Sequence, residues 1–115
     1  MSYRSFEELE VWKRSCQLAV KLYSILRNCK DYAYRDQMQR SAISIPSNIA
    51  EGAERGSMKD FIRFLHIAKG SAGELRTQLY IAEKVGLIQP QDRRSLCEEL
   101  CSISKMLQSL ISSLS

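Results

Sequence analysis

The sequence predicts an all-α protein of four helices that pack as one bundle. Apolar residues recur at three- and four-residue spacing through four long segments, which is the pattern of helices with one apolar side. Short segments with turn residues separate them, and only two prolines and five glycines interrupt 115 residues. We expect helices at about residues 6–28, 34–52, 58–85 and 90–113, within a single domain.

The first predicted helix begins at Ser5, because Glu8 three residues later completes a capping box. It carries two apolar rows about a third of a turn apart. The row expected to face the core contains Leu9, Trp12, Cys16, Ala19, Tyr23 and Leu26. The second row contains Val11, Leu18, Leu22 and Ile25. We expect another subunit to cover this second row, because large exposed apolar patches mark interfaces. The alternative is that the bundle wraps the helix on two sides.

The second predicted helix contains the least ordinary run of the chain, which mixes an apolar period with polar residues and a proline. Its core side is expected to contain Tyr34, Met38, Ala42, Ile45 and Ile49. Pro46 has no backbone N–H, so we expect the helix to bend or loosen there. Gly52 is expected to end the helix. Ile43 and Ala50 point away from the core side, and we assign them to the same subunit interface.

The third and fourth helices have clear end signals. Ser57 is a predicted N-cap, Gly86 a predicted helix end, and Pro90 suits the first turn of the last helix. The third helix is expected to bury Phe61, Phe64, Leu65, Ala68, Ala72, Leu75, Leu79 and Ala82, and the fourth a seam of Leu96, Leu100, Ile103, Leu107, Leu110 and Leu114. Gly70 and Gly73 weaken the third helix, so we expect tight packing against the second helix to offset their cost.

Composition sets limits on partners and location. A net charge of +4 and a pI of about 9.0 permit nucleic-acid binding without requiring it. The four cysteines show no paired C-x-x-C spacing, and no apolar signal segment opens the chain. We therefore expect a cytoplasmic protein with reduced thiols. No apolar run approaches the roughly 20 residues that span a membrane, so no membrane partner is expected.

The sequence offers no set of residues for catalysis, a metal or a cofactor. His66 is the single histidine, and Arg63 stands where a Glu-x-x-His metal motif needs an acid. Cys97 and Cys101 lie one turn apart and provide only two thiols. Neither a Gly-rich phosphate loop nor a Ser/His/Asp set is present. We expect a protein that is not an enzyme and that uses no metal or cofactor.

Two groups of polar residues are candidates for binding. An interhelical polar network, which fixes helix register or holds a ligand, is expected from Arg40, Ser41, Asn48, Glu51 and Glu74. A basic stripe is expected along the outer side of the third helix, formed by Lys59, Arg63, His66, Lys69, Arg76, Tyr80 and Lys84, with Arg55 in the preceding loop extending it. Cations with an interleaved aromatic suit a phosphate backbone, although a solvated basic face has the same pattern.

Nearly the whole chain resembles one known family. The matching positions are Phe6, Leu9, Val11-Trp12, Gln39-Arg40-Ser41-Ala42, Ser44-Ile45-Pro46, Asn48-Ile49-Ala50-Glu51-Gly52, Arg55, Ser57, Phe61, Phe64-Leu65, Ala68, Gly70-Ser71, Glu74-Leu75, Thr77 and Gly86. With these residues the chain resembles the 23S rRNA intervening-sequence protein family, also described as four-helix bundle proteins. The resemblance implies an antiparallel, up-and-down bundle in a ring-like homo-oligomer, most commonly a pentamer, with no established enzymatic activity.

The residues and the resemblance together predict a non-catalytic homo-oligomer that binds RNA or DNA, with structured RNA first, through phosphate contacts from the basic stripe. The association of the family with ribosomal RNA insertions favours RNA. The alternative is an oligomeric scaffold that binds a partner protein, with the same stripe attracting an acidic partner. A small-molecule site at the junction of the second and third helices is a third hypothesis.

Overall fold

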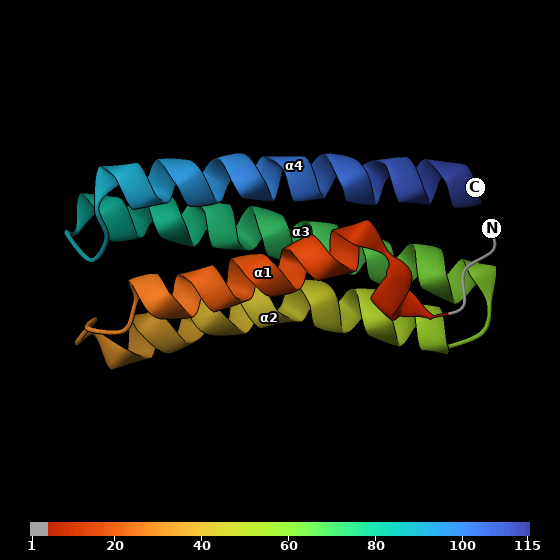
Figure 1. Ribbon diagram of the computed structural model, residues 1–115, viewed down its shortest axis with the longest axis horizontal. Helices are drawn as coiled ribbons and strands as arrows, with labels where there is room; N and C mark the ends of the chain where they lie inside the picture. Colours follow the sequence, from red (N-terminus) through yellow and green to blue (C-terminus); the bar gives the residue numbers. More distant parts are fainter. Residues whose placement is uncertain (1–4) are drawn as a thin grey trace.

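The computed structural model describes residues 5–115 and shows four α-helices connected by short turns (Figure 1). They are α1 (Glu10–Ile25), α2 (Tyr32–Glu54), α3 (Met58–Lys84) and α4 (Pro90–Leu114), and a 3-10 turn, η1 (Phe6–Glu8), precedes them. No strand occurs among the described residues. The prediction of an all-α fold with four helices is confirmed.

The helices form two layers, with α1 and α2 in one and α3 and α4 in the other (Figure 1). Successive helices run antiparallel, and each helix packs along two neighbours, because α1 and α3 both contact α2 and α4. The bundle measures 43 × 20 × 19 Å. The outer faces of the two layers therefore lie on opposite sides of the molecule. Within residues 5–115, no helix combines the length and the apolar character needed to cross a membrane.

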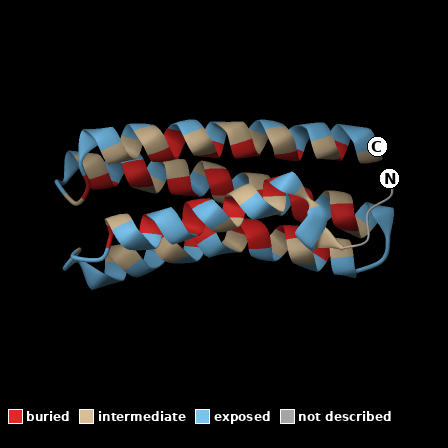
Figure 2. Cartoon of the chain, viewed as in Figure 1, coloured by how far each residue is buried: buried red, intermediate tan, exposed pale blue. Residues whose placement is uncertain are grey.

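The core uses the apolar row of α1 that the sequence assigned to a subunit interface. Buried residues gather on the sides of the helices that face one another (Figure 2). Leu22 is fully buried, and Val11 and Leu18 are 4% and 2% exposed. By contrast Tyr23, which was expected in the core, is 48% exposed, and Trp12 is only half-buried. The assignment of Val11, Leu18 and Leu22 to an oligomer interface is therefore wrong, because these side chains fill the centre of the single chain.

A serine interrupts the apolar pattern of this core row in the sequence. Ser15 lies among Val11, Leu18 and Leu22 and is itself 0% exposed, so the row does not read as continuously apolar. The Ser15 hydroxyl donates to the backbone carbonyl of Val11 at 2.7 Å, which satisfies it without any partner from another helix. A serine bonded in this way is buried at little cost, so it can occupy a core position in an otherwise apolar row.

The chain enters α1 through a turn rather than a continuous helix. Ser5 accepts a hydrogen bond from the backbone N–H of Glu7 at 3.2 Å, and Leu9 then adopts an extended conformation that separates η1 from α1. The predicted single helix from residue 6 is therefore interrupted. The break turns Phe6 back onto Trp12, with ring centroids 5.3 Å apart in an edge-to-face arrangement.

The second helix continues through both positions that were expected to disturb or end it. Pro46 lies inside α2, and the helix runs past Gly52 to Glu54. Gly52 is needed for a close approach instead, because a Cβ there would lie 2.6 Å from the Cβ of Phe64 on α3. The left-handed backbone conformation falls two residues after the end of α2, at Gly56, with φ of 84°.

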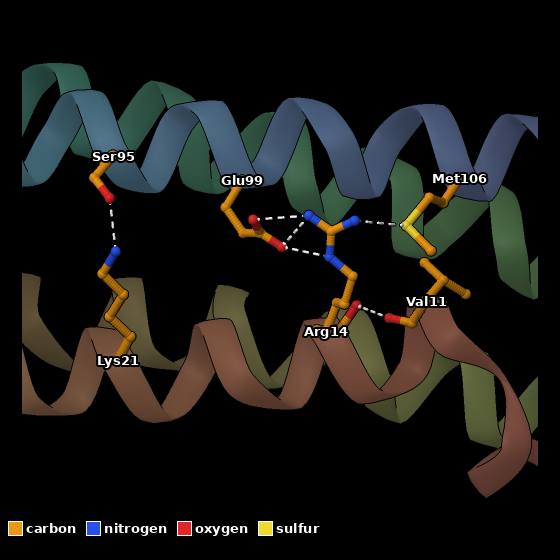
Figure 3. Close-up of polar contacts among 7 residues, drawn as sticks. Val11, Arg14, Lys21, Ser95, Glu99 and Met106 are labelled. Carbon is orange, nitrogen blue, oxygen red and sulfur yellow. Dashed lines mark hydrogen bonds and ion pairs between the residues drawn. The ribbon is translucent and has the colours of Figure 1, made fainter.

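Polar contacts connect α1 to α4 (Figure 3). Arg14 donates to both carboxylate oxygens of Glu99 at 2.8 and 2.9 Å, and Lys21 donates to the Ser95 hydroxyl at 2.6 Å. The hydrogen bond from Arg14 to Glu99, together with the carboxylate charge, raises the pKa of Arg14. Both side chains of this ion pair are about one-third exposed, so we expect it to contribute about 1 kcal/mol or less.

The glycines of α3 do not mark close helix packing. Gly70 and Gly73 have no neighbouring atom within 4 Å of the position a Cβ would take. The expectation that tight packing against α2 offsets their cost is therefore wrong. Ala68 and Ala72, two small residues of the same stretch, are the ones buried in the core.

Replacing Gly52 by alanine should destabilise the protein, because the added methyl group meets backbone-anchored atoms of α3 that cannot move aside freely. We expect Gly52→Ala to lower the free energy of unfolding by about 1–3 kcal/mol in urea titrations. Gly70→Ala is the matched control, since its methyl group meets nothing and should stabilise α3 by about 0.5–1 kcal/mol. Equal effects of the two changes would contradict the packing described here.

Candidate nucleic-acid interface

The predicted basic stripe lies on the outer side of α3. Lys59, Arg63, His66, Tyr80 and Lys84 are exposed, and Lys69 and Arg76 are half-buried. The two half-buried cations lean toward α4, where Lys69 donates to the side-chain Oε1 atom of Gln108 at 2.7 Å and Arg76 contacts the Cys101 sulfur at 3.5 Å. Both partners are neutral, so the positive charge of these two residues is not compensated. The surface therefore belongs to α3 and α4 together.

The fourth helix contributes cations that the sequence analysis missed. Arg94 and Lys105 are exposed, and they lie seven residues before and four residues after Cys101, which contacts Arg76. Residues at these spacings share one side of a helix, and this side also carries one exposed acid, Glu98, three residues before Cys101. The spacing is visible in the sequence, but only the packing of α4 beside α3 shows that this side adjoins the stripe. We call the combined surface the α3–α4 basic face.

Acidic residues border the α3–α4 basic face. Arg63 lies 3.8 Å from Asp60, an exposed and long ion pair that leaves most of its charge available. At the other end, Arg93 pairs with Glu83 at 2.7 Å and its guanidinium lies 4.5 Å from the centre of the Tyr80 ring. Tyr80 is still 53% exposed. The cations are thus flanked, but not neutralised, by the borders.

The loop residue Arg55 joins the basic face as expected. Its guanidinium lies 4.9 Å from the centre of the Phe64 ring, and that of Arg63 lies 4.5 Å from the same ring. Both cations are therefore held around one aromatic side chain. Arg55 also pairs with Glu51 one turn earlier, at 3.3 Å.

The predicted interhelical polar network forms only in part. Asn48 donates to the backbone carbonyl and the hydroxyl of Ser44 at 2.8 and 2.9 Å, and Ser44 bonds to Ser71 of α3 at 2.8 Å. Glu51 pairs with Arg55, just after the end of α2, instead. The prediction of a single charged network of the five residues is therefore wrong, because serine and asparagine side chains make the polar contact between α2 and α3.

The two remaining charged members, Arg40 and Glu74, border a groove between α2 and α3. This groove has a volume of about 380 Å³ and is lined by Gln37, Arg40, Ser41, Ser44, Glu74 and Gln78. We call it the polar groove. Within residues 5–115, neither Arg40 nor Glu74 makes an ion pair or a side-chain hydrogen bond.

An apolar groove of about 530 Å³ lies between α1 and α2, in the layer opposite the α3–α4 basic face. It is lined by Phe6, Trp12, Cys16, Ala19, Val20, Tyr23, Ile43, Pro46, Ser47 and Ala50. Val20 is 70% exposed and Ile43 is 43% exposed, and burial raises the pKa of the Cys16 thiol. Ile43 and Ala50, which the sequence assigns to a subunit interface, both line this groove. Ile25, the remaining residue of that predicted interface, is half-buried and packs against the core.

The other reactive groups stand apart from one another. No three His, Cys, Asp or Glu side chains within residues 5–115 gather closely enough to hold a metal ion. Cys97 is buried, which raises the pKa of its thiol, whereas Cys101 is exposed. The two thiols of α4 therefore occupy different environments despite their one-turn spacing.

Comparison with known proteins addresses the ancestry of this arrangement. The family model described as 23S rRNA-intervening sequence protein matches residues 7–109. This chain belongs to that family. The resemblance noted in the sequence is thereby confirmed over nearly the full length of the chain.

A solved structure agrees with the family assignment. The chain is similar to the crystal structure of a protein with unknown function from the S23 ribosomal protein family of Bacteroides thetaiotaomicron. The two share 28% sequence identity with a TM-score of 0.82, and the match covers 88% of this chain and 97% of the other. A search of curated proteins found no match. Family membership and the solved structure therefore agree with the four-helix fold, and the surfaces of the bundle are the features that bear on function.

Proposed function

We propose that this member of the 23S rRNA-intervening sequence family is a non-catalytic homo-oligomer that binds structured RNA through the α3–α4 basic face. The observation that carries the proposal is the state of the cations on that face. Lys69 and Arg76 contact neutral partners on α4, and no ion pair holds Lys59 or Lys84 within residues 5–115. A face of uncompensated cations along a straight helix suits the regular spacing of a phosphate backbone.

The chemistry of the face favours backbone contacts over base reading. From Lys59 to Lys84 the cations extend over about 38 Å of helix, at roughly 1.5 Å per residue. Lysine and arginine on a convex helix surface reach phosphates, which position a nucleic acid but carry little sequence information. The family name, with its reference to 23S rRNA, supports RNA over DNA as the ligand.

We also propose that a second copy of the chain covers the apolar groove. The groove exposes Val20, Tyr23 and Ile43 beside Trp12, and contiguous apolar surface of this kind marks interfaces. Because α1 and α2 form the layer opposite α3 and α4, assembly there leaves the basic face outward (Figure 1). Repetition of a weakly binding face around a ring, with five copies expected from the family resemblance, raises the overall affinity.

A partner protein with an acidic surface is the second candidate ligand. The guanidinium groups of Arg55 and Arg63 stack around Phe64, which presents two planar donor groups near each other. Arginine in this arrangement suits bidentate contact with carboxylates as well as with phosphates. A scaffold role would use the same face and the same assembly.

Neutralising the basic face should abolish RNA binding. We expect the triple variant Arg63→Gln, Lys69→Gln, Arg76→Gln to bind a labelled RNA hairpin far more weakly in fluorescence anisotropy. Each lost phosphate contact should reduce the slope of log affinity against log salt by about 0.7–0.9, so the three together by about 2–3.

The matched control removes three cations from the opposite layer. Lys13, Arg27 and Lys30 are exposed and lie outside the basic face, so the variant Lys13→Gln, Arg27→Gln, Lys30→Gln changes net charge equally. RNA affinity should fall much less in this control. Equal losses would show that net charge alone drives binding, and no RNA binding by the unaltered protein at low salt would leave the partner-protein function.

Charges introduced into the apolar groove should dissociate the oligomer without unfolding the protomer. Val20 and Ile43 are exposed in the single chain, so Val20→Glu with Ile43→Glu should lower the solution mass measured by light scattering to that of a monomer. The control is Met58→Glu with Val85→Glu, two exposed apolar residues at the start of α3 and just after its end. An unchanged mass in the groove variant would contradict the proposed interface.

A further inference from the structure

The polar groove between α2 and α3 contains more hydrogen-bonding capacity than the chain uses. The Oε1 atom of Gln78 is buried and has no hydrogen-bond partner within residues 5–115. Such atoms are rare, because burial removes their bonds to water. The backbone carbonyl of the same residue accepts a hydrogen bond from the Tyr34 hydroxyl at 2.7 Å, which holds this part of α3 against α2. The backbone oxygen of Gln78 therefore has a hydrogen-bond donor, whereas its side-chain oxygen has none.

Ser41 supplies a second polar group to the groove, although its hydroxyl oxygen, unlike the Oε1 atom of Gln78, remains accessible to solvent. Ser41 is 6% exposed, and its hydroxyl makes no hydrogen bond among the described residues. By contrast, Ser15 bonds to its own helix and Ser44 bonds to Ser71. The Ser41 hydroxyl is therefore available to a molecule in the groove.

The groove also brings together a cation and an anion that do not pair with each other. Arg40 from α2 and Glu74 from α3 both line it, yet the described chain contains no ion pair between them. The seam between α1 and α4 is the contrasting case, because there Arg14 and Glu99 meet directly (Figure 3). Opposite charges held on two sides of a groove are complementary to a ligand that carries both.

We propose that the polar groove binds a small zwitterion, with a carboxylate on Arg40 and an ammonium group on Glu74. Arginine binds carboxylates through two parallel hydrogen bonds, and Glu74 accepts from an ammonium group. Gln78 accepts a further N–H, for which its side chain rotates toward the ligand, and Ser41 donates or accepts as required. An anion alone would face the Glu74 charge, and a cation alone would face Arg40.

The site differs from the proposed RNA surface in chemistry and in place. A phosphate backbone is repelled by the Glu74 carboxylate and has no donor for the Oε1 atom of Gln78. A volume of about 380 Å³ is at the small end of the range for ligand sites, which suits a molecule of amino-acid size. Binding of a zwitterion and binding of RNA can therefore succeed or fail independently.

A series of amino acids with increasing charge separation tests the proposal. The probes are glycine, β-alanine, 4-aminobutanoate and 6-aminohexanoate, added to isotope-labelled protein and followed by NMR. The half-ligands are propanoate and propylamine. We expect one chain length to give saturable shifts of the Gln78 side-chain amide and the Ser41 backbone amide, and both half-ligands to bind about tenfold more weakly or worse.

Variants identify the groups responsible. Arg40→Gln and Glu74→Gln should each lower affinity about tenfold or more, because each removes one charge-assisted hydrogen bond. Gln78→Met should weaken binding to a smaller extent. Arg94→Gln and Glu98→Gln, which alter exposed charges of α4 outside the groove, should leave it unchanged. Arg40 and Glu74 are exposed, so their variants should fold, which circular dichroism checks.

Three outcomes would overturn the proposal. The first is the absence of saturable shifts with every zwitterion at millimolar concentration, and the second is binding that persists in both charge variants. The third is a fall in solution mass for Arg40→Gln or Glu74→Gln, because the unpaired charges would then belong to a contact between copies of the chain.

Discussion

A four-helix bundle can bury only one side of each helix, and α1 has two apolar rows. The row through Leu18 and Leu22 fills the core. Trp12 and Tyr23 of the other row, with Val20 beside them, therefore border the outward-facing groove. The break at Leu9 then adds Phe6 to the same side by turning it onto Trp12. The apolar groove between α1 and α2 is therefore a direct consequence of how the core is filled, and it makes one layer of the molecule unlike the other.

The second helix connects the surfaces of the bundle. Pro46 interrupts no helix and instead contributes to the floor of the apolar groove, whereas Gly52 lets α3 approach closely enough for Phe64 to pack. On its other side the same helix presents Arg40 and Ser41 to the polar groove. The unusual mixture of residue types from Arg40 to Gly52 is explained by these separate contacts, each of which demands a different side chain.

The sequence predicts the helices well because local signals define them. Ser57 caps α3 by accepting from the Asp60 N–H at 3.1 Å, Gly86 adopts a φ of 82° after it, and Pro90 begins α4. The choice between the two rows of α1 failed because Ser15 bonds within its own helix and so passes as apolar. Gly52 was misread because a helix stop and a close contact require the same residue.

The surfaces were predictable only as far as one helix at a time. The spacing along α3 placed its cations together, but the neighbours of Lys69 and Arg76 lie on α4, and no pattern within one helix identifies them. Likewise, the sequence grouped Arg40 with Glu51 and Glu74, whereas the packing of α2 on α3 separates Glu51 from the other two. Contacts between helices depend on rotation and register, which apolar periodicity leaves open.

If assembly uses the layer of α1 and α2 and RNA binds the layer of α3 and α4, as we propose, the two layers have to respond to different partners. Hydroxyl-radical footprinting read by mass spectrometry measures this directly, by comparing dilute protein, concentrated protein and protein with an RNA hairpin. Tyr23 in the apolar groove should lose reactivity on assembly, and Tyr80 on the basic face should lose it only when RNA is added. Protection of Tyr80 by assembly, or of Tyr23 by RNA at constant solution mass, would contradict this division between the two layers.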